Sequence, residues 1–452
     1  MNRQQPRSVW TPLILPEDSL EAATPPPEMT APPGDEEREE EEREVADQAP
    51  PIQPSARGGH QLVMDPGSQN IYLFGGWDGN QDLADFWVYS VTAAKWTLIS
   101  SNTEADGGPP SRSCHKMVVD PVYHQIFVLG RYLERGLRDL HTNIKSDFYV
   151  YDIGSSTWTQ ITDDTAALGG PSLIFDHQMC LDSDRRCIYV FGGQSLHVTE
   201  EESRPSAEKK FSGLYVYCVA NNTWRLLAAD GAVLSPGVPP LRSRTGHSML
   251  WNSSDRRLYV FGGQRKRDEY LHDFFSYCPD TGEVRLLRNT FDIQKPNQVR
   301  LLSDGNGGGE GAIHAVGYTQ RATIDCVRGE IHVMTGLNKD KDKDKRSGET
   351  RVSNSFWVYN LSSACWSVVY KNENNEPGYW TKHQSVEPRP RYAHQLVYDE
   401  TRCLHYMFGG NPGGREGKDG RLRLGDFWSL HLVRLEKKEF ERAARKMVRI
   451  AR

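Results

Sequence analysis

The chain has 452 residues, which is enough for a large buried core, and 10% of them are aromatic. Its 40 glycines favour many short strands joined by turns over a helical protein. The net charge of −6 means that the overall charge gives no reason to expect nucleic acid or acidic membrane surfaces as partners. No apolar run approaches the roughly 18 residues that a spanning helix needs, so we expect no membrane insertion.

The N-terminal region divides into two parts. Residues 1–14 contain VWTPLI around Trp10, which is similar to the strands KWTLIS and TWTQIT later in the chain, and we predict a β-strand there. Residues 15–56 are rich in proline and acidic side chains, a composition typical of disorder. That segment is either a solvated loop or a specific docking tail.

One sequence pattern then occurs six times between residues 57 and 434. Each copy begins at a histidine, or at Gln320 in the fifth copy. An apolar or aromatic run begins 12 residues later, and a glycine follows 15 residues after the histidine, except that the fifth copy has Thr335 there. Farther along each of the first five copies, two aromatic or apolar positions are nine residues apart. The residues expected to be structural are Trp10, His60, Gly75, Gly76, Trp96, His115, Trp158, His177, Gly192, Gly193, Trp224, His247, Gly262, Gly263, Trp366, His394, Gly409 and Gly410.

Each copy predicts four short strands, because its apolar runs are bounded by Asp, Asn, Gly and Pro. A lone four-stranded sheet cannot bury both faces, whereas copies stacked around an axis can. We therefore predict an all-β fold, a six-bladed β-propeller over residues 57–434. The sixth copy lacks its last strand, and the strand around Trp10 is expected to complete it and close the ring.

The last 18 residues, 435–452, predict a short amphipathic helix. Apolar residues recur along one stripe and basic residues cover much of the remaining surface. This C-terminal helix packs either on its own propeller or on a helix of a partner.

One face of the propeller is expected to carry all the length variation. We call it the variable face: it holds the connections from second to third strands and from each blade to the next. The variable segments are 131–146, 194–210, 288–318, 337–353, 370–393 and 411–424. Unequal loops on a rigid scaffold favour protein binding. The candidate protein-binding residues are Trp77, Asp78, Arg112, Arg131, Tyr132, Arg244, Arg265, Arg321 and Arg391. The alternative for arginines that precede the repeat histidine is that they hold a blade together.

Nothing in the sequence predicts an enzyme. The chain has no GxSxG, HExxH or P-loop motif and no Cys/His cluster of metal-binding spacing, so we expect no catalytic residue, cofactor or metal. A metal-dependent oxidase would need histidines that converge on one ion. His141, His197 and His314 on the variable face are the candidates for that remote alternative.

The eight cysteines are scattered, with no CxxC pair. They predict reduced, mostly buried thiols, typical of a cytoplasmic or nuclear protein.

The repeat resembles the kelch motif, in which an apolar run ends in Gly-Gly and a tyrosine and a tryptophan follow at set distances. Longer stretches are similar to the propeller of the muskelin family, among them GGWDGNQDLADFWVYS, GGPSLIFDHQMCLDS, GYTQRATID and PRYAHQLVYDE. These stretches are spread from residue 58 to residue 430.

The muskelin resemblance implies an intracellular, non-catalytic subunit of the CTLH-type (GID-related) E3 ubiquitin ligase, one that recruits or positions partners. The alternative is a ligase-independent kelch scaffold linked to the cytoskeleton, cell spreading or trafficking. Muskelins carry discoidin-like, LisH and CTLH regions before the propeller, whereas only about 57 residues precede the first blade here. We therefore expect a propeller-only relative or a truncated sequence. The oligomeric state stays open.

Overall fold

The computed structural model describes residues 7–14, 53–134, 144–199, 206–266, 269–288, 319–336, 352–372, 379, 386–413 and 422–433. Most of the segment predicted to be disordered, at 15–52, lies outside these residues. So does the C-terminal helix predicted at 435–452.

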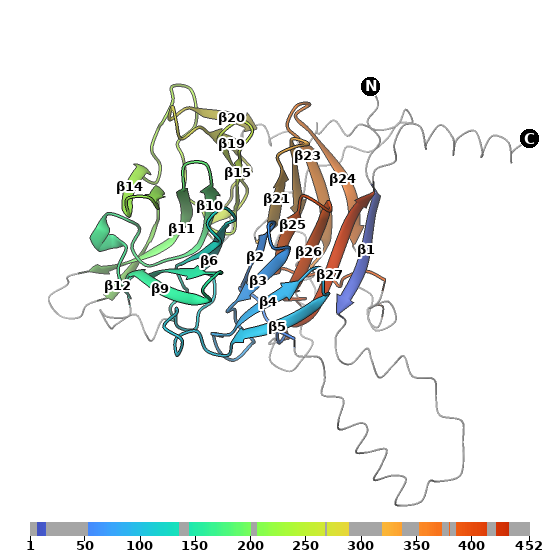
Figure 1. Cartoon of the computed structure of the whole chain (residues 1–452). Helices are drawn as coiled ribbons and strands as arrows, with labels where there is room; N and C mark the ends of the chain where they lie inside the picture. The colour runs from blue at the N-terminus through green and yellow to red at the C-terminus, as the bar shows by residue number, and fades with distance from the viewer. Residues whose placement is uncertain are drawn as a thin grey trace, which may run out of the picture.

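Six antiparallel sheets, five with four strands and one with five, confirm the predicted six-bladed propeller (Figure 1). Blade 1 consists of β2 (Gln61–Asp65), β3 (Asn70–Phe74), β4 (Phe86–Ser90) and β5 (Lys95–Ser100). Blade 2 consists of β6 (Lys116–Asp120), β7 (Gln125–Leu129), β8 (Phe148–Asp152) and β9 (Thr157–Thr162). Blade 3 consists of β10 (Ile174–Asp182), β11 (Cys187–Thr199), β13 (Leu214–Cys218) and β14 (Thr223–Ala228), with β12 (Ser206–Phe211) paired to β11.

The second half of the chain repeats this plan. Blade 4 consists of β15 (Ser248–Asn252), β16 (Arg257–Phe261), β19 (Phe274–Tyr277) and β20 (Val284–Arg288), with the small hairpin β17 (Gln264–Lys266) and β18 (Glu269–Tyr270) beside it. Blade 5 consists of β21 (Arg321–Asp325), β22 (Glu330–Met334), β23 (Asn354–Asn360) and β24 (Cys365–Asn372). Blade 6 consists of β25 (Gln395–Asp399), β26 (Leu404–Gly410), β27 (Leu424–Val433) and β1 (Arg7–Ile14). The first strands of successive blades contact one another, and β2 also contacts β25, which closes the ring.

The N-terminal strand supplies the outer strand of the last blade. β1 pairs antiparallel with β27, with Trp10 opposite Leu430, and Figure 1 shows the two strands side by side. The Trp10 ring packs edge-on against Tyr370 of blade 5, 5.6 Å between centroids. The chain therefore joins its two ends within one sheet, so β27 has a partner on both sides.

Aromatic rings fill the space between neighbouring blades. Phe86 of blade 1 packs edge-on against Tyr151 of blade 2 at 4.9 Å, and Trp158 lies 5.3 Å from the same ring. Equivalent trios are Phe148 with Tyr217 and Trp224, Phe274 with Tyr359 and Trp366, and Phe427 with Tyr89 and Trp96. The regular spacing of tyrosine and tryptophan in the sequence thus reflects packing against the preceding blade.

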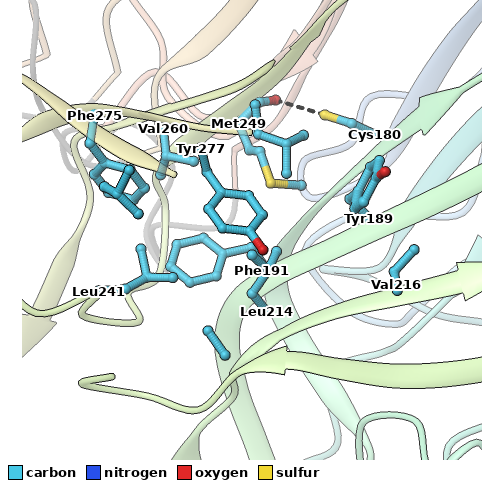
Figure 2. Packing of buried hydrophobic residues seen from close by; sticks show 13 residues of the cluster. Cys180, Tyr189, Phe191, Leu214, Val216, Leu241, Met249, Val260, Phe275 and Tyr277 are labelled. Carbon is cyan, nitrogen blue, oxygen red and sulfur yellow. Dashed lines mark hydrogen bonds between the residues drawn. The ribbon is translucent and has the colours of Figure 1, made fainter. Parts of the chain in front are cut away.

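The interface between blades 3 and 4 is built mainly from aliphatic residues. Figure 2 shows Leu214 and Phe191 of blade 3 gathered with Tyr277 and Phe275 of blade 4. Val284 stands here where other copies have tryptophan. The Cys180 thiol donates to the carbonyl oxygen of Met249, at 3.2 Å, and links the two inner strands.

The repeat glycines and histidines meet across blade boundaries. A Cβ placed on Gly75 of blade 1 would lie 2.5 Å from the carbonyl oxygen of Arg112 and 3.1 Å from Cε1 of His115, both of blade 2. The same relation joins Gly130 to His177, Gly192 to His247, Gly262 to Gln320 and Gly409 to His60. Only glycine leaves room for the next blade at this point.

Five repeat histidines are completely buried, and burial lowers the pKa of each well below its usual value. They are His60, His115, His177, His247 and His394. These rings are therefore neutral in the folded protein at neutral pH.

Candidate interaction face

The first loop of the variable face is a tight hairpin between Trp77 and Asp82 in blade 1. The Trp77 backbone exchanges hydrogen bonds with Gly58, at 2.8 and 3.0 Å. Asp78 Oδ1 accepts from the backbone N–H of Asn80 and of Gln81, at 2.6 and 2.8 Å, so its carboxylate shapes the loop. Both Trp77 and Asp78 are half-buried and keep part of their side chains in solvent.

Arg131 and Tyr132 lie where blade 2 meets blade 3. The backbone N–H of Arg131 donates to Ile174 of blade 3, at 3.0 Å, and the N–H of Tyr132 donates to Ser113, at 2.9 Å. The Tyr132 ring is 37% exposed and packs edge-on against Phe175, 5.3 Å away. Burial lowers the pKa of Arg131, although its neighbour Asp147 opposes the shift.

A small apolar cluster supports this part of the variable face. Its members come from blades 2 and 3, both from loops and from β10 and β11, and are Leu133, Ile144, Leu173, Phe175 and Leu196. The segment 194–210, which the sequence analysis treated as a variable loop, instead contains the end of β11 and most of β12, paired as a ribbon. The Lys209 ammonium on this ribbon lies 5.3 Å from the Phe175 ring.

Arg265 ties blade 4 to blade 3. Its guanidinium makes a bidentate ion pair with Asp230, at 2.6 and 2.9 Å, and donates to the carbonyl oxygen of Ser243. It also lies over the Phe211 ring, 4.3 Å from the centroid. Most of its capacity for hydrogen bonding is therefore used inside the chain.

The expectation that Arg112, Arg244 and Arg391 line a binding face is wrong, because their side chains are 0% exposed. Arg112 donates to both carboxylate oxygens of Asp147, at 2.9 and 2.7 Å, and to the carbonyl oxygen of Gly130. Burial alone would raise the pKa of Asp147, but the Arg112 charge lowers it. In blade 2, this pair links the residues before β6 to the end of β7 and to the start of β8.

This arrangement, which we call the Arg–Asp clasp, occurs in four blades. The pairs are Arg57 with Asp85, Arg112 with Asp147, Arg244 with Asp273, and Arg391 with Asp426. Blade 3 has Ile174 and Gly213 at the two positions, and the fifth copy has Gly317 and Ser355. Arginine and aspartate are thus present together or absent together, a signal in the sequence that would have identified the clasp.

A ring of backbone hydrogen bonds surrounds the axis at the variable face. The residue before each repeat histidine, or before Gln320, has a positive φ; these six are Gly59, Cys114, Asp176, Gly246, Thr319 and Ala393. The N–H of Cys114 donates to Gly59 at 2.9 Å, and that of Asp176 donates to Cys114 at 3.1 Å. Gly59 donates in turn to Ala393 at 3.2 Å, which links the first blade to the last.

Two basic residues occupy equivalent positions of opposite blades. Lys116 of blade 2 and Arg321 of blade 5 each follow the residue at the repeat-histidine position. Arg321 donates to Oε1 of Gln395, at 3.2 Å, and therefore belongs to the inner strands rather than to the outer loops. Lys116 is 8% exposed, and burial, with the charge of Arg321 as a second cause, lowers the pKa of Lys116 to about 7.

Within the described ranges no group of three or more His, Cys, Asp or Glu side chains is placed to hold a metal ion. His197 contacts two serine hydroxyls, Ser195 at 2.9 Å and Ser172 at 3.4 Å. His141 and His314 lie outside the described residues. None of the helices in the described part of the chain has the length and apolar character needed to cross a membrane.

The chain is similar to known repeat proteins over part of its length. Residues 39–236 match the family model described as the KLHDC2/KLHL20/DRC7 Kelch-repeats domain. Over 381 residues, 84% of this chain, the sequence is 29% identical to Mei4-dependent protein 6 of Schizosaccharomyces pombe and covers 48% of that protein. It is 28% identical over 234 residues to human Multiple epidermal growth factor-like domains protein 8, with 49% of this chain and 7% of that protein covered.

A further similarity is to mouse Leucine-zipper-like transcriptional regulator 1, 24% identical over 226 residues, which covers 49% of this chain and 24% of that protein. The chain spans less than half the length of each of these relatives. The fold is a β-propeller, and its first half is similar to Kelch-repeat domains.

Proposed function

We propose that this chain is a non-catalytic protein-interaction propeller that binds protein partners through its variable face. The observation that carries the proposal is the surface formed by Arg131, Tyr132, Phe175 and Lys209, which we call the Tyr132 patch. A tyrosine that is 37% exposed packs there on a buried phenylalanine, and the Lys209 ammonium lies 5.3 Å from the same phenylalanine ring. Rigidly supported aromatic and arginine side chains are the residues that most often dominate binding energy at interfaces.

The more specific form of the proposal is an adaptor or substrate-positioning subunit of a CTLH-type E3 ubiquitin ligase. Its support is the muskelin-like stretches of the sequence, several of which fall on the variable face. GGWDGNQDLADFWVYS contains the Trp77 hairpin, and GGPSLIFDHQMCLDS contains Phe175 of the Tyr132 patch. Two of the muskelin-like stretches thus contribute residues to the variable face, one of them to the Tyr132 patch.

The test compares three full-length baits purified from native lysate, with their partners quantified by mass spectrometry. The baits are the wild type, Tyr132→Ala, and Tyr123→Ala as the matched control. Tyr123 is a 52% exposed tyrosine in the turn between β6 and β7, at the other end of blade 2. We expect ligase subunits or their substrates with the wild type and with Tyr123→Ala, and their depletion with Tyr132→Ala.

Each result distinguishes between the two forms of the proposal. Specific partners that are not ligase subunits, but that depend on Tyr132, would favour the ligase-independent scaffold. Ligase subunits that bind all three baits equally would place the contact away from the Tyr132 patch. If no protein depends on either the chain or the patch, the interaction proposal is wrong.

A further inference from the structure

Blade 3 places two cysteines directly opposite each other on neighbouring strands. Cys187 is the first residue of β11, Cys218 is the last residue of β13, and the two are paired in the antiparallel register. Neither forms a disulfide, and both are partly exposed. The expectation of mostly buried thiols is wrong, since Cys180 alone of the eight cysteines is buried.

The hydrogen-bond pattern shows that the two cysteines form the closer kind of cross-strand pair. The N–H of Val219 donates to the carbonyl oxygen of Arg186, at 3.0 Å, just outside the pair. Cys187 and Cys218 therefore form a non-hydrogen-bonded pair, in which Cα atoms are typically about 4.5 Å apart and side chains approach each other. That separation falls inside the range of roughly 4.4–6.8 Å that disulfides require.

Two thiols occupy this position of the repeat in blade 3, whereas blade 4 has Arg257 and Cys278 there. The equivalent pairs in three other blades are Asn70 with Ser90, Gln125 with Asp152, and Glu330 with Asn360. Those polar side chains suit a position at the partly exposed end of a blade. Two cysteines have no such advantage there, which favours a role in thiol chemistry over simple packing.

We propose that Cys187 and Cys218 are a redox modification site that forms a reversible intramolecular disulfide in the presence of a peroxide. One thiolate attacks a peroxide oxygen, the O–O bond breaks, and a sulfenic acid and hydroxide form. The second thiolate then attacks the sulfenic sulfur, forming the S–S bond and releasing a second hydroxide. The two protons lost by the thiols convert both hydroxides to water, and two electrons pass from the sulfurs to the peroxide. A dithiol reductant restores both thiols by thiol–disulfide exchange and is itself oxidised to a disulfide.

The surroundings of the pair predict how the reaction depends on pH. Burial raises the pKa of Cys187 to about 11, with the neighbouring Cys218 as a second cause. Because the thiolate is the reactive form, we expect disulfide formation to be slow near pH 7 and to accelerate as the pH rises.

The cross-link would close the part of the chain that carries the β11–β12 ribbon. Residues 187–218 include the end of β11 and all of β12, and the ribbon bears Lys209 of the Tyr132 patch. A disulfide between Cys187 and Cys218 closes the residues between them into a loop, which reduces the conformational freedom of the unfolded chain. We expect the oxidised protein to melt a few degrees higher than the reduced protein.

The test uses the purified full chain with hydrogen peroxide as the oxidant, followed by alkylation of the remaining thiols and digestion with trypsin. Trypsin cuts after Arg186, Lys209 and Arg225, so Cys187 and Cys218 fall on different peptides. We expect a cross-linked pair of these peptides that disappears on reduction. Cys218→Ser should abolish it, and Cys365→Ser, whose strand partner is Asn360, should not affect it.

If a variant fails to fold, oxidation of the wild-type chain alone is enough to test the proposed disulfide. Cys187 and Cys218 recovered separately alkylated, while other cysteines of the same sample are oxidised, would overturn the proposal. So would a cross-link found only in species of twice the mass, since the proposed bond lies within one chain.

Discussion

Gly409 of blade 6 lies directly against His60 of blade 1. A Cβ on Gly409 would be 2.8 Å from Cε1 of His60 and 2.6 Å from the carbonyl oxygen of Arg57. These residues are 349 positions apart (409 − 60), yet they make the same contact that joins consecutive blades. The first and last copies of the repeat are therefore neighbours in a closed ring.

Gly409→Ala should therefore destabilise the protein. The new methyl group would collide with the backbone of blade 1, and the φ of +66° would be strained for alanine. We expect a loss of about 2–4 kcal/mol in the free energy of unfolding, measured with urea. Gly107→Ala is the matched control, because Gly107 has a φ of +79° with nothing within 4 Å. If both variants lose the same stability, backbone strain alone is responsible and the contact between blades is unimportant.

Removal of one arginine of the clasp should also be costly. Arg391 is 0% exposed, and Arg391→Ala would leave the Asp426 carboxylate buried without its partner. We expect a loss of about 3–5 kcal/mol in the free energy of unfolding. The exposed pair of Lys145 and Asp163 provides the comparison, and Lys145→Ala should leave the urea midpoint almost unchanged. A small effect for Arg391→Ala would mean that water enters the site and solvates Asp426.

The fold could be predicted from the sequence because the contacts that define it recur at fixed spacings. The interval of 15 from His60 to Gly75 follows from one hairpin, and hairpins without insertions keep their length. The clasp was harder to recognise, since Arg112 and Asp147 are 35 residues apart and a variable loop separates them. From the sequence alone, an arginine on a loop is therefore interpreted as a binding residue, because the partner that buries it lies far away in the sequence.

The Tyr132 patch could not be predicted as a surface for a related reason. Its residues come from blades 2 and 3: Arg131 and Tyr132 lie on a loop after β7, whereas Phe175 and Lys209 lie on β10 and β12. Their contacts depend on how this irregular loop packs on the neighbouring blade. Sequence periodicity carries no information about such loops. The lengthening of β11 and the pairing with β12 were missed because Glu and Lys in the second strand are poor strand formers.

Stability should fall steeply in mild acid because of the buried histidines. Burial lowers the pKa of all five rings, so the folded state stays neutral where the unfolded state, with pKa values of about 6.5, takes up protons. Their contribution is fully present above pH 6.5 and is lost as the pH falls below it. With five protons involved, the free energy of unfolding would drop by up to about 7 kcal/mol per pH unit, measured by urea unfolding between pH 7 and 5.

The chain itself supplies the control for the histidine prediction. Gln320 occupies the repeat-histidine position before the inner strand of blade 5, so His177→Gln should fit the same space in blade 3. We expect this variant to fold and its free energy of unfolding to depend less steeply on pH, because four histidines rather than five would take up protons on unfolding. An unchanged slope would mean that His177 does not take part in the acid transition.

Lys116 should be a destabilising residue at neutral pH. Its pKa of about 7 lies far below that of the unfolded chain, near 10.4, so the unfolded state binds a proton that the folded state loses. Stability should therefore rise between pH 7 and pH 10, and Lys116→Gln should remove that rise. Glutamine occurs at the equivalent positions of three blades, as Gln61, Gln178 and Gln395. The variant should be a few kcal/mol more stable at pH 7 and no more stable at pH 10. Equal stability at both values would show that the Lys116 ammonium is well solvated.

Removal of residues 1–14 should open the last blade. β27 would lose its outer partner β1, and the packing of Trp10 on Tyr370 and Trp428 would go with it. The exposed edge of β27 is then free to pair with another chain, so we expect a lower melting temperature and association detectable by light scattering. A synthetic peptide of residues 7–14 should bind the edge and reverse both effects, because it restores the same backbone hydrogen bonds. Deletion of residues 1–6, which precede the strand, is the control. A variant without residues 1–14 that melts with the full chain and stays monomeric would show that the ring is stable without its closing strand.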